Sequence, residues 1–581
     1  MPHQLLRAAL LATALSSVAC ASAKPGEFPS QGELTELAGH ALPRTIFAEK
    51  TADVDAWELA GPLPDAIETK EHKGSSPFDQ ILADLSAKRA GLVFPSESMH
   101  CAARETARFV AERGASPPQA LRRFMGARCG APQPRFAFAS VRLDVGKDRT
   151  DDEVTAKLRI DADKMIADTV GAGARLAGIA MVRSDKRAVL VVTAQERSVS
   201  LERLPTVAAA GKVVLRGELL NPAASVRALV NRGRFSYAVC KANEGVKLPS
   251  FEIVCDAAPE DAAAWVTVAA FPAGRILGND VLDVLVFPNG KPTSAFAAPR
   301  PSAGAKPGRP VEADVVAELN ALRKEAGLAP VALDARESAV VAKLTPHYFA
   351  AASGLEDETI ADKVVLGVRA GWDVQGVVLS ADTTSVVVRG ASDAQSLIQE
   401  AIESPFGRSA LFDPEVQRVA VGLVYDEESK SSAALFGAYA LADTQKHEQD
   451  AARLVERITK LRAARKLPPP LVLAQLSPDA IRAARSLESG DKTLEEALDE
   501  LVHRSVGAMS TAMQGFYATG PSIESIKIAE EILSRPSLSI ALAVGHHKAP
   551  GKAWASLVAL IVIDADKTAA HTARLAVPAA L

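Results

Sequence analysis

The sequence predicts an α+β protein in which repeated units of helices and strands flank one all-β sandwich domain. Three segments carry a helical pattern that ends shortly before a proline, at residues 81–92, 318–328 and 457–467. Later in the chain, each is followed by a pair of apolar runs typical of neighbouring strands, at residues 176–195, 416–440 and 538–563. Self-similarity of this kind indicates a repeated architecture. Three unrelated α+β domains are the alternative interpretation.

At 581 residues, the chain is longer than one hydrophobic core usually serves, so we expect several domains. The pattern predicts a signal peptide (1–20), a tether (21–74), a first repeated unit (75–203), a β-sandwich (204–290), a linker (291–310), a middle unit (311–445) and a third unit (446–581). The tether and the linker are rich in Ala and Pro, a composition that does not support a core. We therefore expect the two halves of the chain to move relative to one another about the linker.

The first unit shows the predicted order of elements most clearly. Phe78, Ile81, Leu82 and Leu85 recur at helical spacing, and the pattern ends at Gly91. Further patterns predict helices from Met99 onward and after the prolines at 117–118, a strand at 136–145, a helix at 161–170, and strands at 177–183 and 188–195. The order is therefore α, α, α, β, α, β, β, and we expect the other two units to repeat it.

Residues 204–290 have a different pattern. Short β-patterned runs are separated by Gly, Pro and Asn turns, with no amphipathic helix between them. The runs lie at 213–219, 235–239, 251–254, 265–271 and 281–287. This arrangement predicts a small antiparallel β-sandwich.

The cysteines indicate an oxidising compartment. Apart from Cys20, they group as Cys101 with Cys129 and Cys240 with Cys255, each pair inside one predicted domain. Two disulfides are the natural interpretation. The alternative, a single four-ligand metal site, lacks C-x-x-C spacing and a histidine near the second pair.

The N-terminus has the pattern of an export signal. Arg7 precedes an apolar run at residues 8–15 that is too short for a permanent membrane helix, and small residues then lead to Cys20. This ending resembles the bacterial lipobox, which implies lipid attachment at Cys20. The alternative is an ordinary signal peptide that is cut near Ala21 or Ala23. We expect a bacterial cell-envelope protein, lipid-anchored at the periplasmic or outer-membrane face, or a secreted protein.

The middle unit carries the most family-like motifs. Its first helix breaks at Gly327 before Leu-Ala-Pro, and a helical segment at 393–403 leads to the turn Ser-Pro-Phe-Gly-Arg (404–408) and a strand at 416–424. These motifs resemble the CAP superfamily (SCP-like extracellular domain). The resemblance implies repeated CAP-like α-β-α sandwich units. In related domains, two histidines and one or two glutamates line a central cleft, with one histidine in this turn.

The middle unit departs from that pattern at both key positions. A Phe-Gly pair precedes Arg408 where related domains carry the histidine, and residues 376–378 provide no carboxylate at the matching strand. His347 and Arg408 are therefore the candidates for a cleft. A lone histidine on a helix beside Leu344 and Phe349 is typical of a packing residue, and one imidazole cannot hold a catalytic zinc.

No other motif predicts a reaction or a metal. His546 and His547 are adjacent at the expected turn of the last hairpin, so they would point to opposite faces, and we expect them to be solvated. The sequence also lacks the G-x-S-x-G, H-E-x-x-H and Walker patterns. We therefore expect no catalytic residue, no metal and no other cofactor.

Composition excludes two further classes of protein. With 48% hydrophobic and 23% charged residues and a formal net charge of -4, the chain is neither disordered nor a nucleic-acid binder. We expect a non-enzymatic binding protein whose partner is an unknown envelope lipid, glycan or protein, and which contacts the membrane through its lipid anchor. An envelope-directed hydrolase and a structural spacer are the alternatives.

Substitution of the expected lipid-attachment residue tests the anchor. Each buried acyl methylene contributes about 0.8 kcal/mol to membrane binding, so several chains on one cysteine would hold the protein stably. We expect Cys20→Ser to release the protein from membrane fractions, as measured by fractionation and immunoblotting. Equal membrane association of the variant and the wild type would rule out this anchor.

Overall fold

The computed structural model describes residues 28–43 and 51–564, apart from gaps at 53, 62, 90–91, 134, 146–149, 172, 185, 276, 299–308, 390–392, 428–430 and 510–511. The chain forms two compact units. The large unit comprises Pro29–Gln375 and Ala381–Tyr439, and the C-terminal unit contains Gly376–Ser380 and the described part of Ala440–Leu581. The predicted signal peptide and Cys20 lie outside the described residues. Within the described ranges, no helix is both long and apolar enough to cross a membrane.

The large unit contains a first and a middle α+β domain. The elements of the first are α2 (Pro77–Lys88), β3 (Val93–Pro95), α3 (Glu97–Arg113), α4 (Gln119–Arg128), β4 (Ala137–Asp144), α5 (Asp151–Val170), β5 (Arg175–Arg183) and β6 (Arg187–Glu196). Those of the middle domain are α6 (Glu312–Glu325), β17 (Ala332–Leu333), α7 (Ala335–Ala352), α8 (Glu358–Ala370), β18 (Val378–Val388), α9 (Ala394–Glu403), α10 (Pro405–Leu411), β19 (Val416–Asp426) and β20 (Ser431–Leu441).

The C-terminal unit contains a third α+β domain. It comprises η2 (Thr444–Lys446), α11 (His447–Ala464), β21 (Leu471–Val472), η3 (Ala474–Leu476), α12 (Ser477–Glu488), α13 (Leu494–Met509), β22 (Met513–Gly520), α14 (Glu530–Ser534), β23 (Ser539–His547) and β24 (Ser556–Asp564). Apart from the additional helix α10 of the middle domain and the short 3-10 turns of the third, the three domains share one order of helices and strands. Their sheets have equivalent strand orders, β3-β5-β6-β4, β17-β19-β20-β18 and β21-β23-β24-β22. The α+β class is confirmed, and the short first strand of each sheet is an element that the sequence analysis missed.

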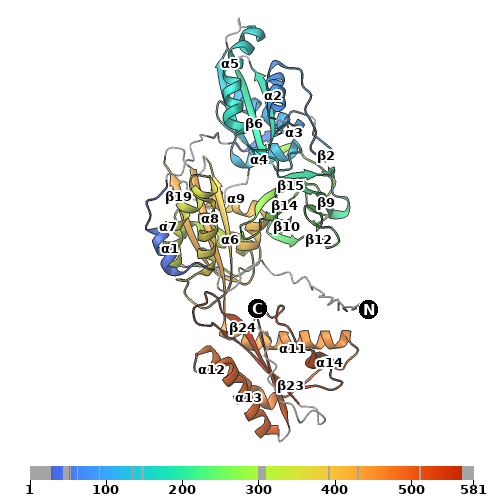
Figure 1. The fold of residues 1–581 in the computed structure, drawn as a ribbon, viewed down its shortest axis with the longest axis vertical. Coiled ribbons are helices and arrows are strands. Elements are labelled where there is room, and N and C mark those ends of the chain that lie inside the picture. The colour runs from blue at the N-terminus through green and yellow to red at the C-terminus, as the bar shows by residue number, and fades with distance from the viewer. Residues whose placement is uncertain are drawn as a thin grey trace, which may run out of the picture. The chain divides into compact units, whose positions relative to one another are not determined.

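Each sheet is covered by helices on both faces. In the third domain, Ala559 and Ile561 of β24 pack in one hydrophobic cluster with α11, and Val558 and Leu560 pack in another with α12 and α13. Successive strand residues point to opposite faces, so an almost continuous apolar run fits a strand that is buried on both sides. Figure 1 shows α11 and α12 on opposite sides of the β23 and β24 hairpin.

A β-sandwich lies between the first and middle domains in the sequence, as expected. One sheet has the order β12-β13-β9-β7 and the other β11-β10-β14-β15. The strands are β7 (Val199–Leu201), β9 (Lys212–Leu219), β10 (Ser225–Arg232), β11 (Ser236–Val239), β12 (Lys241–Ala242), β13 (Ser250–Asp256), β14 (Ala264–Phe271) and β15 (Asn279–Val286). Leu215 and Ile253 of the first sheet and Val230 and Val266 of the second belong to one buried core.

Both expected disulfides are present. Cys101 on α3 is bonded to Cys129, which follows α4, with the two Cα atoms 5.6 Å apart. Cys240, which lies between β11 and β12, is bonded to Cys255 of β13, with the two Cα atoms 4.4 Å apart. Both bonds lie in the large unit.

The predicted tether is folded in its described part. Helix α1 (Gln31–Ala38) packs on the middle domain, where Gln31 Nε2 donates to Asp373 Oδ1 at 3.1 Å. Strand β1 (Ala56–Glu58) pairs with β16 (Ala295–Ala297) at the start of the predicted linker, and β2 (Ala66–Ile67) pairs with β8 (Leu204–Pro205). These strands were not predicted, because two or three residues that pair with a distant segment show no periodic pattern in the sequence.

Polar contacts join the domains of the large unit. Arg123 of α4 forms two hydrogen bonds of 2.9 Å with Asp283 of the sandwich, and both side chains are buried. Asn231 of the sandwich donates to the Glu403 carbonyl of the middle domain at 3.0 Å. Of these two contacts, only the Asn231 to Glu403 contact joins segments on the two sides of the linker, and it runs against the motion expected there. The composition of a linker does not describe the surfaces that it connects.

One buried arginine occupies the same place in two of the α+β domains. In α6, Arg323 Nε donates to the Ala329 carbonyl at 2.9 Å and Nη1 donates to the Leu411 carbonyl at 2.6 Å. In α11, Arg462 Nε donates to the Pro468 carbonyl at 2.9 Å and Nη1 to the Ile532 carbonyl at 2.7 Å. Both side chains are fully buried. Each links the first helix of its domain to the helix that precedes the closing hairpin.

Removal of this arginine should destabilise its domain. Arg462→Leu would leave the Pro468, Ile532 and Arg535 carbonyls without their donor in a buried site, and we expect a loss of about 3 kcal/mol or more in the free energy of unfolding. Urea unfolding followed by circular dichroism measures the loss. Arg465→Leu, which removes an exposed arginine paired with Glu530, is the control and should change stability little. Equal effects of the two substitutions would contradict this role.

Candidate metal centre

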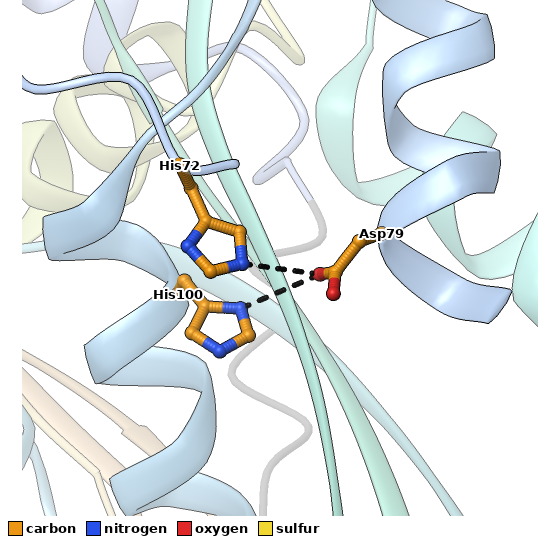
Figure 2. Close-up of side chains that lie close together, drawn as sticks. All are labelled: His72, Asp79 and His100. Atoms are coloured by element: carbon orange, nitrogen blue, oxygen red, sulfur yellow. Dashed lines mark ion pairs between the residues drawn. The ribbon is translucent and has the colours of Figure 1, made fainter. Parts of the chain in front are cut away.

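The structure brings His72, Asp79 and His100 of the large unit together (Figure 2). One possible ligand atom of each residue lies within 4.8 Å of the others. Nε2 of His72 is 3.3 Å from Oδ1 of Asp79, and Nδ1 of His100 is 3.7 Å from the same oxygen. The two imidazole rings are stacked with their centroids 3.7 Å apart, so each presents a nitrogen to the carboxylate.

Local backbone structure positions the three side chains. The His72 amide donates to the Pro95 carbonyl at 3.0 Å, which holds this loop against the segment that enters α3. Asp79 lies in the first turn of α2, where its Oδ2 accepts from the Ser76 amide at 3.0 Å in a capping box. Because the capping box uses Oδ2, Oδ1 is left to face the two histidines. His100 lies in the first turn of α3.

The facing atoms are buried without hydrogen bonds. The side chains of His72, Asp79 and His100 are 14%, 9% and 21% exposed. Both nitrogens of His72, Oδ1 of Asp79 and Nδ1 of His100 are inaccessible and have no hydrogen-bond partner in suitable geometry. Buried polar groups are normally satisfied, so this group needs a ligand or water to complete it. At Gly74, a Cβ atom would lie 2.4 Å from His72 Nε2, so a side chain there would crowd the site.

The donor set fits a divalent transition metal. Zinc binds imidazole nitrogen and carboxylate oxygen at about 2.0–2.2 Å, which places tetrahedral ligand atoms roughly 3.4 Å apart. The observed separations of 3.3 and 3.7 Å are close to this spacing. The rings are only 15° from parallel, so one ring must tilt before both lone pairs meet at one ion. Burial, followed by the neighbouring His72, lowers the pKa of His100 and so favours the neutral imidazole that binds metals.

Glu97 lies on the far side of His72. Its Oε1 is 3.2 Å from Nδ1 of His72, and its side chain is about half exposed. A carboxylate at the second nitrogen of a metal-binding imidazole fixes the ring orientation and raises its basicity. Glu97 is therefore suited to orient His72.

No sequence pattern predicted these residues as a site. His72 and Asp79 are 7 residues apart, and Asp79 and His100 are 21 apart, which matches no ligand motif. The expected absence of a metal was argued from cleft positions in the middle unit and from other histidines. One pattern in the sequence could have indicated the site. The capping sequence Ser76 to Asp79 begins a helix, and one histidine precedes that helix in the sequence while another follows it.

His347, one of the two residues expected in a cleft, is buried in the middle domain. It lies on α7 with 1% of its surface exposed, and Nδ1 is 3.2 Å from Glu356 Oε1. The His40 ring is 6.4 Å away between centroids. His347 belongs to neither of the two possible ligand groups found among the described residues.

Arg408 serves as a domain contact instead of a cleft residue. Its Nε donates to the Ile402 carbonyl at 2.7 Å, and Nη1 donates to the Gly233 carbonyl of the sandwich at 2.8 Å. Burial lowers the pKa of Arg408 to about 10, and the nearby Glu403 opposes this shift. The two predicted cleft residues therefore have separate partners, and the structure does not join them in one site.

The expectation of solvent-exposed histidines in the last hairpin is wrong for His546. Strand β23 extends through His547, and His546 is only 8% exposed because α12 packs against this end of the strand. His546 lies beside His447 and Glu488, which form the second possible ligand group with it. Neighbours in the sequence gave no sign of this arrangement.

A cavity of about 260 Å³ lies between α1 and the middle domain. Leu34 of α1, Glu337 and Lys343 of α7, and Trp372 are among its lining residues. Burial raises the pKa of Glu337 to about 7, although its carboxylate accepts from the Asp373 amide at 2.9 Å. The cavity is smaller than most ligand pockets, and the chain's own helix forms one wall.

Comparison with known proteins gives little further information. No family model matches the chain, and no curated protein matches it. Among solved structures, a cysteine-rich secretory protein from Staphylococcus aureus is 12% identical, with 45% of this chain and 85% of that chain covered and a TM-score of 0.16. A score this low carries no argument about fold or function.

The buried carboxyl of Glu337 should make stability depend on pH. Its raised pKa means that the folded protein keeps a proton which the unfolded chain releases between pH 4.5 and about 7. The contribution of Glu337 to stability therefore falls by about 3 kcal/mol as pH rises through this window. Urea unfolding at several pH values should show Glu337→Gln losing this dependence, and the control Glu36→Gln, at an exposed position of α1, should retain it. Parallel profiles for wild type and Glu337→Gln would contradict the assignment.

Proposed function

We propose that this protein is an exported binding protein of the bacterial cell envelope, built from three CAP-like units, and that its first α+β domain binds a divalent transition-metal ion. The observation that carries metal binding is the convergence of His72, Asp79 and His100, whose facing atoms are buried and have no hydrogen-bond partner. This proposal departs from the expectation of no metal, because that expectation did not consider these residues together.

Two features support export. The N-terminal residues have the pattern of a signal peptide that ends at Cys20. The large unit contains two disulfides, and such bonds persist mainly in oxidising compartments. A lipid on Cys20 would hold the protein at a membrane surface, where it could bind an envelope lipid, glycan or protein in addition to the metal.

The proposal of CAP-like units rests on shared architecture. Apart from helix α10 of the middle domain, the three α+β domains have the same order of helices and strands, and their sheets have equivalent strand orders. Arg323 and Arg462 also make matching hydrogen bonds in two of the domains. Divergent copies of one unit account for both observations.

Binding fits the site better than hydrolysis does. A hydrolytic zinc site keeps one coordination position for water and places a base beside it. Here the neighbouring carboxylate, Glu97, lies at Nδ1 of His72, on the side of the ring away from Asp79. From that side it can orient the ligand but cannot take a proton from water bound to the metal.

Calorimetric titration with Zn²⁺ tests this function. We use the full mature chain after treatment with a chelator, carrying Glu488→Gln so that the second histidine group is disrupted. His100→Ala should remove the binding event, and Glu97→Gln should weaken binding by about 10- to 100-fold, because it removes the group that orients His72.

A matched control is available on α13. His503 is exposed, and His503→Ala should leave the titration unchanged. Binding that survives His100→Ala with the same affinity would reject the site, and so would the absence of any heat of zinc binding.

A further inference from the structure

We infer that the C-terminal unit holds a second divalent-metal site, formed by His447, Glu488 and His546, which stabilises the fold of that unit. This inference goes beyond the proposed function because it concerns the other compact unit and a structural role. One possible ligand atom of each residue lies within 4.8 Å of the others. Nδ1 of His447 is 2.9 Å from Oε1 of Glu488, and Nδ1 of His546 is 3.4 Å from the same oxygen.

Three elements that are distant in the sequence supply these side chains. His447 is the first residue of α11, Glu488 is the last residue of α12, and His546 lies near the end of β23. Because α11 and α12 cover opposite faces of the sheet, one ion at this position would connect both helical layers to the central strand.

The protein holds the ligands in place by its own contacts. The backbone amide of His546 donates to Oε1 of Glu488 at 3.3 Å. At Gly545, a Cβ atom would lie 2.9 Å from Oε1 of Glu488 and 3.2 Å from the Ala484 side chain, so glycine allows the end of α12 to approach the strand closely. Ligands that are positioned in advance lower the ordering cost of binding an ion.

The environment of the ligands suits an ion. The three side chains are only 11–13% exposed. Nδ1 of His546, which faces Glu488, is inaccessible and has no hydrogen-bond partner. The two rings are tilted by 51° with centroids 5.6 Å apart, so, unlike stacked rings, they can direct lone pairs toward a common point.

The composition of the C-terminal unit favours a structural role. The chain has no cysteine after Cys255, so this unit contains no disulfide, whereas the large unit contains two. A metal that binds the folded state alone stabilises it by mass action and can act as a cross-link. Two imidazoles and one carboxylate select Zn²⁺ and related first-row ions over Ca²⁺ and Mg²⁺, which prefer oxygen ligands.

This site is not a copy of the one in the first domain. There the ligands come from the loop before α2 and from the first turns of α2 and α3. Here they come from the start of α11, the end of α12 and a hairpin strand. The two sites can therefore be removed and tested independently.

Thermal unfolding of the full mature chain tests the inference. We use the His100→Ala background, in which the proposed first site is removed, and compare melting temperatures in Zn²⁺ and in a chelator. Zn²⁺ should raise the transition of the C-terminal unit by several degrees, and Glu488→Gln or His447→Gln should abolish the rise. Co²⁺ should produce visible absorption bands typical of a four-coordinate site, and the same variants should lose them.

The controls keep the outcomes distinct. His547→Gln alters the adjacent histidine, which lies outside the ligand group, and should keep the full zinc response. The quantity compared is the difference between the melting temperatures of one variant in Zn²⁺ and in chelator. A variant that is simply less stable therefore does not count for or against the inference. The inference is wrong if the His100→Ala chain shows no zinc response or if the response survives both Glu488→Gln and His447→Gln. Neither result bears on the first site, which is titrated in the Glu488→Gln background.

Discussion

The arrangement of an α+β domain depends on how its first helix is held to the segment that precedes its closing hairpin. In two domains a fully buried arginine makes this tie through backbone carbonyls, including Leu411 near the end of α10 and Ile532 in α14. A cation near the carboxyl end of a helix is favoured by the helix dipole, and the fork of donors satisfies several carbonyls together. Aligned on its leucines, the first domain has Ser86 at this position, and its hydroxyl donates only to the Val93 carbonyl at 2.6 Å. That domain has the Cys101 to Cys129 disulfide as a covalent constraint of its own.

Sequence patterns predicted the elements that have a clear period. The long helices and the closing hairpins were expected because an amphipathic stripe or a continuous apolar run leaves a local signal. Strands β3, β17 and β21 were missed because two or three residues cannot show a period, and each pairs in parallel with a strand far along the chain. The folded part of the predicted tether was missed for the same reason, since β1 pairs with a strand more than two hundred residues away.

The candidate sites were harder to predict than the fold. Cys101 with Cys129 and Cys240 with Cys255 were found because disulfide partners within one small domain have few alternatives. Metal ligands on separate helices have no such restriction, and His546 looked exposed because only its sequence neighbours were considered. Its burial depends on Gly545, which allows α12 to approach the strand and bring Glu488 to it. That contact is set by tertiary packing and has no local pattern.

In the middle domain, neighbouring elements cover surfaces that could otherwise form a site. Arg408 donates to the Gly233 carbonyl of the sandwich, so this surface is used for domain packing. Helix α1 covers another surface of the same domain beside Glu337 and Trp372. A surface that is buried by a neighbouring element cannot admit a ligand. The outer domains instead have groups of two histidines and one carboxylate, which lie on a loop and two helix ends in the first domain and on two helix ends and a strand in the third. Each group is therefore assembled and buried by the packing of its own domain, so a shared order of elements does not by itself predict a shared site.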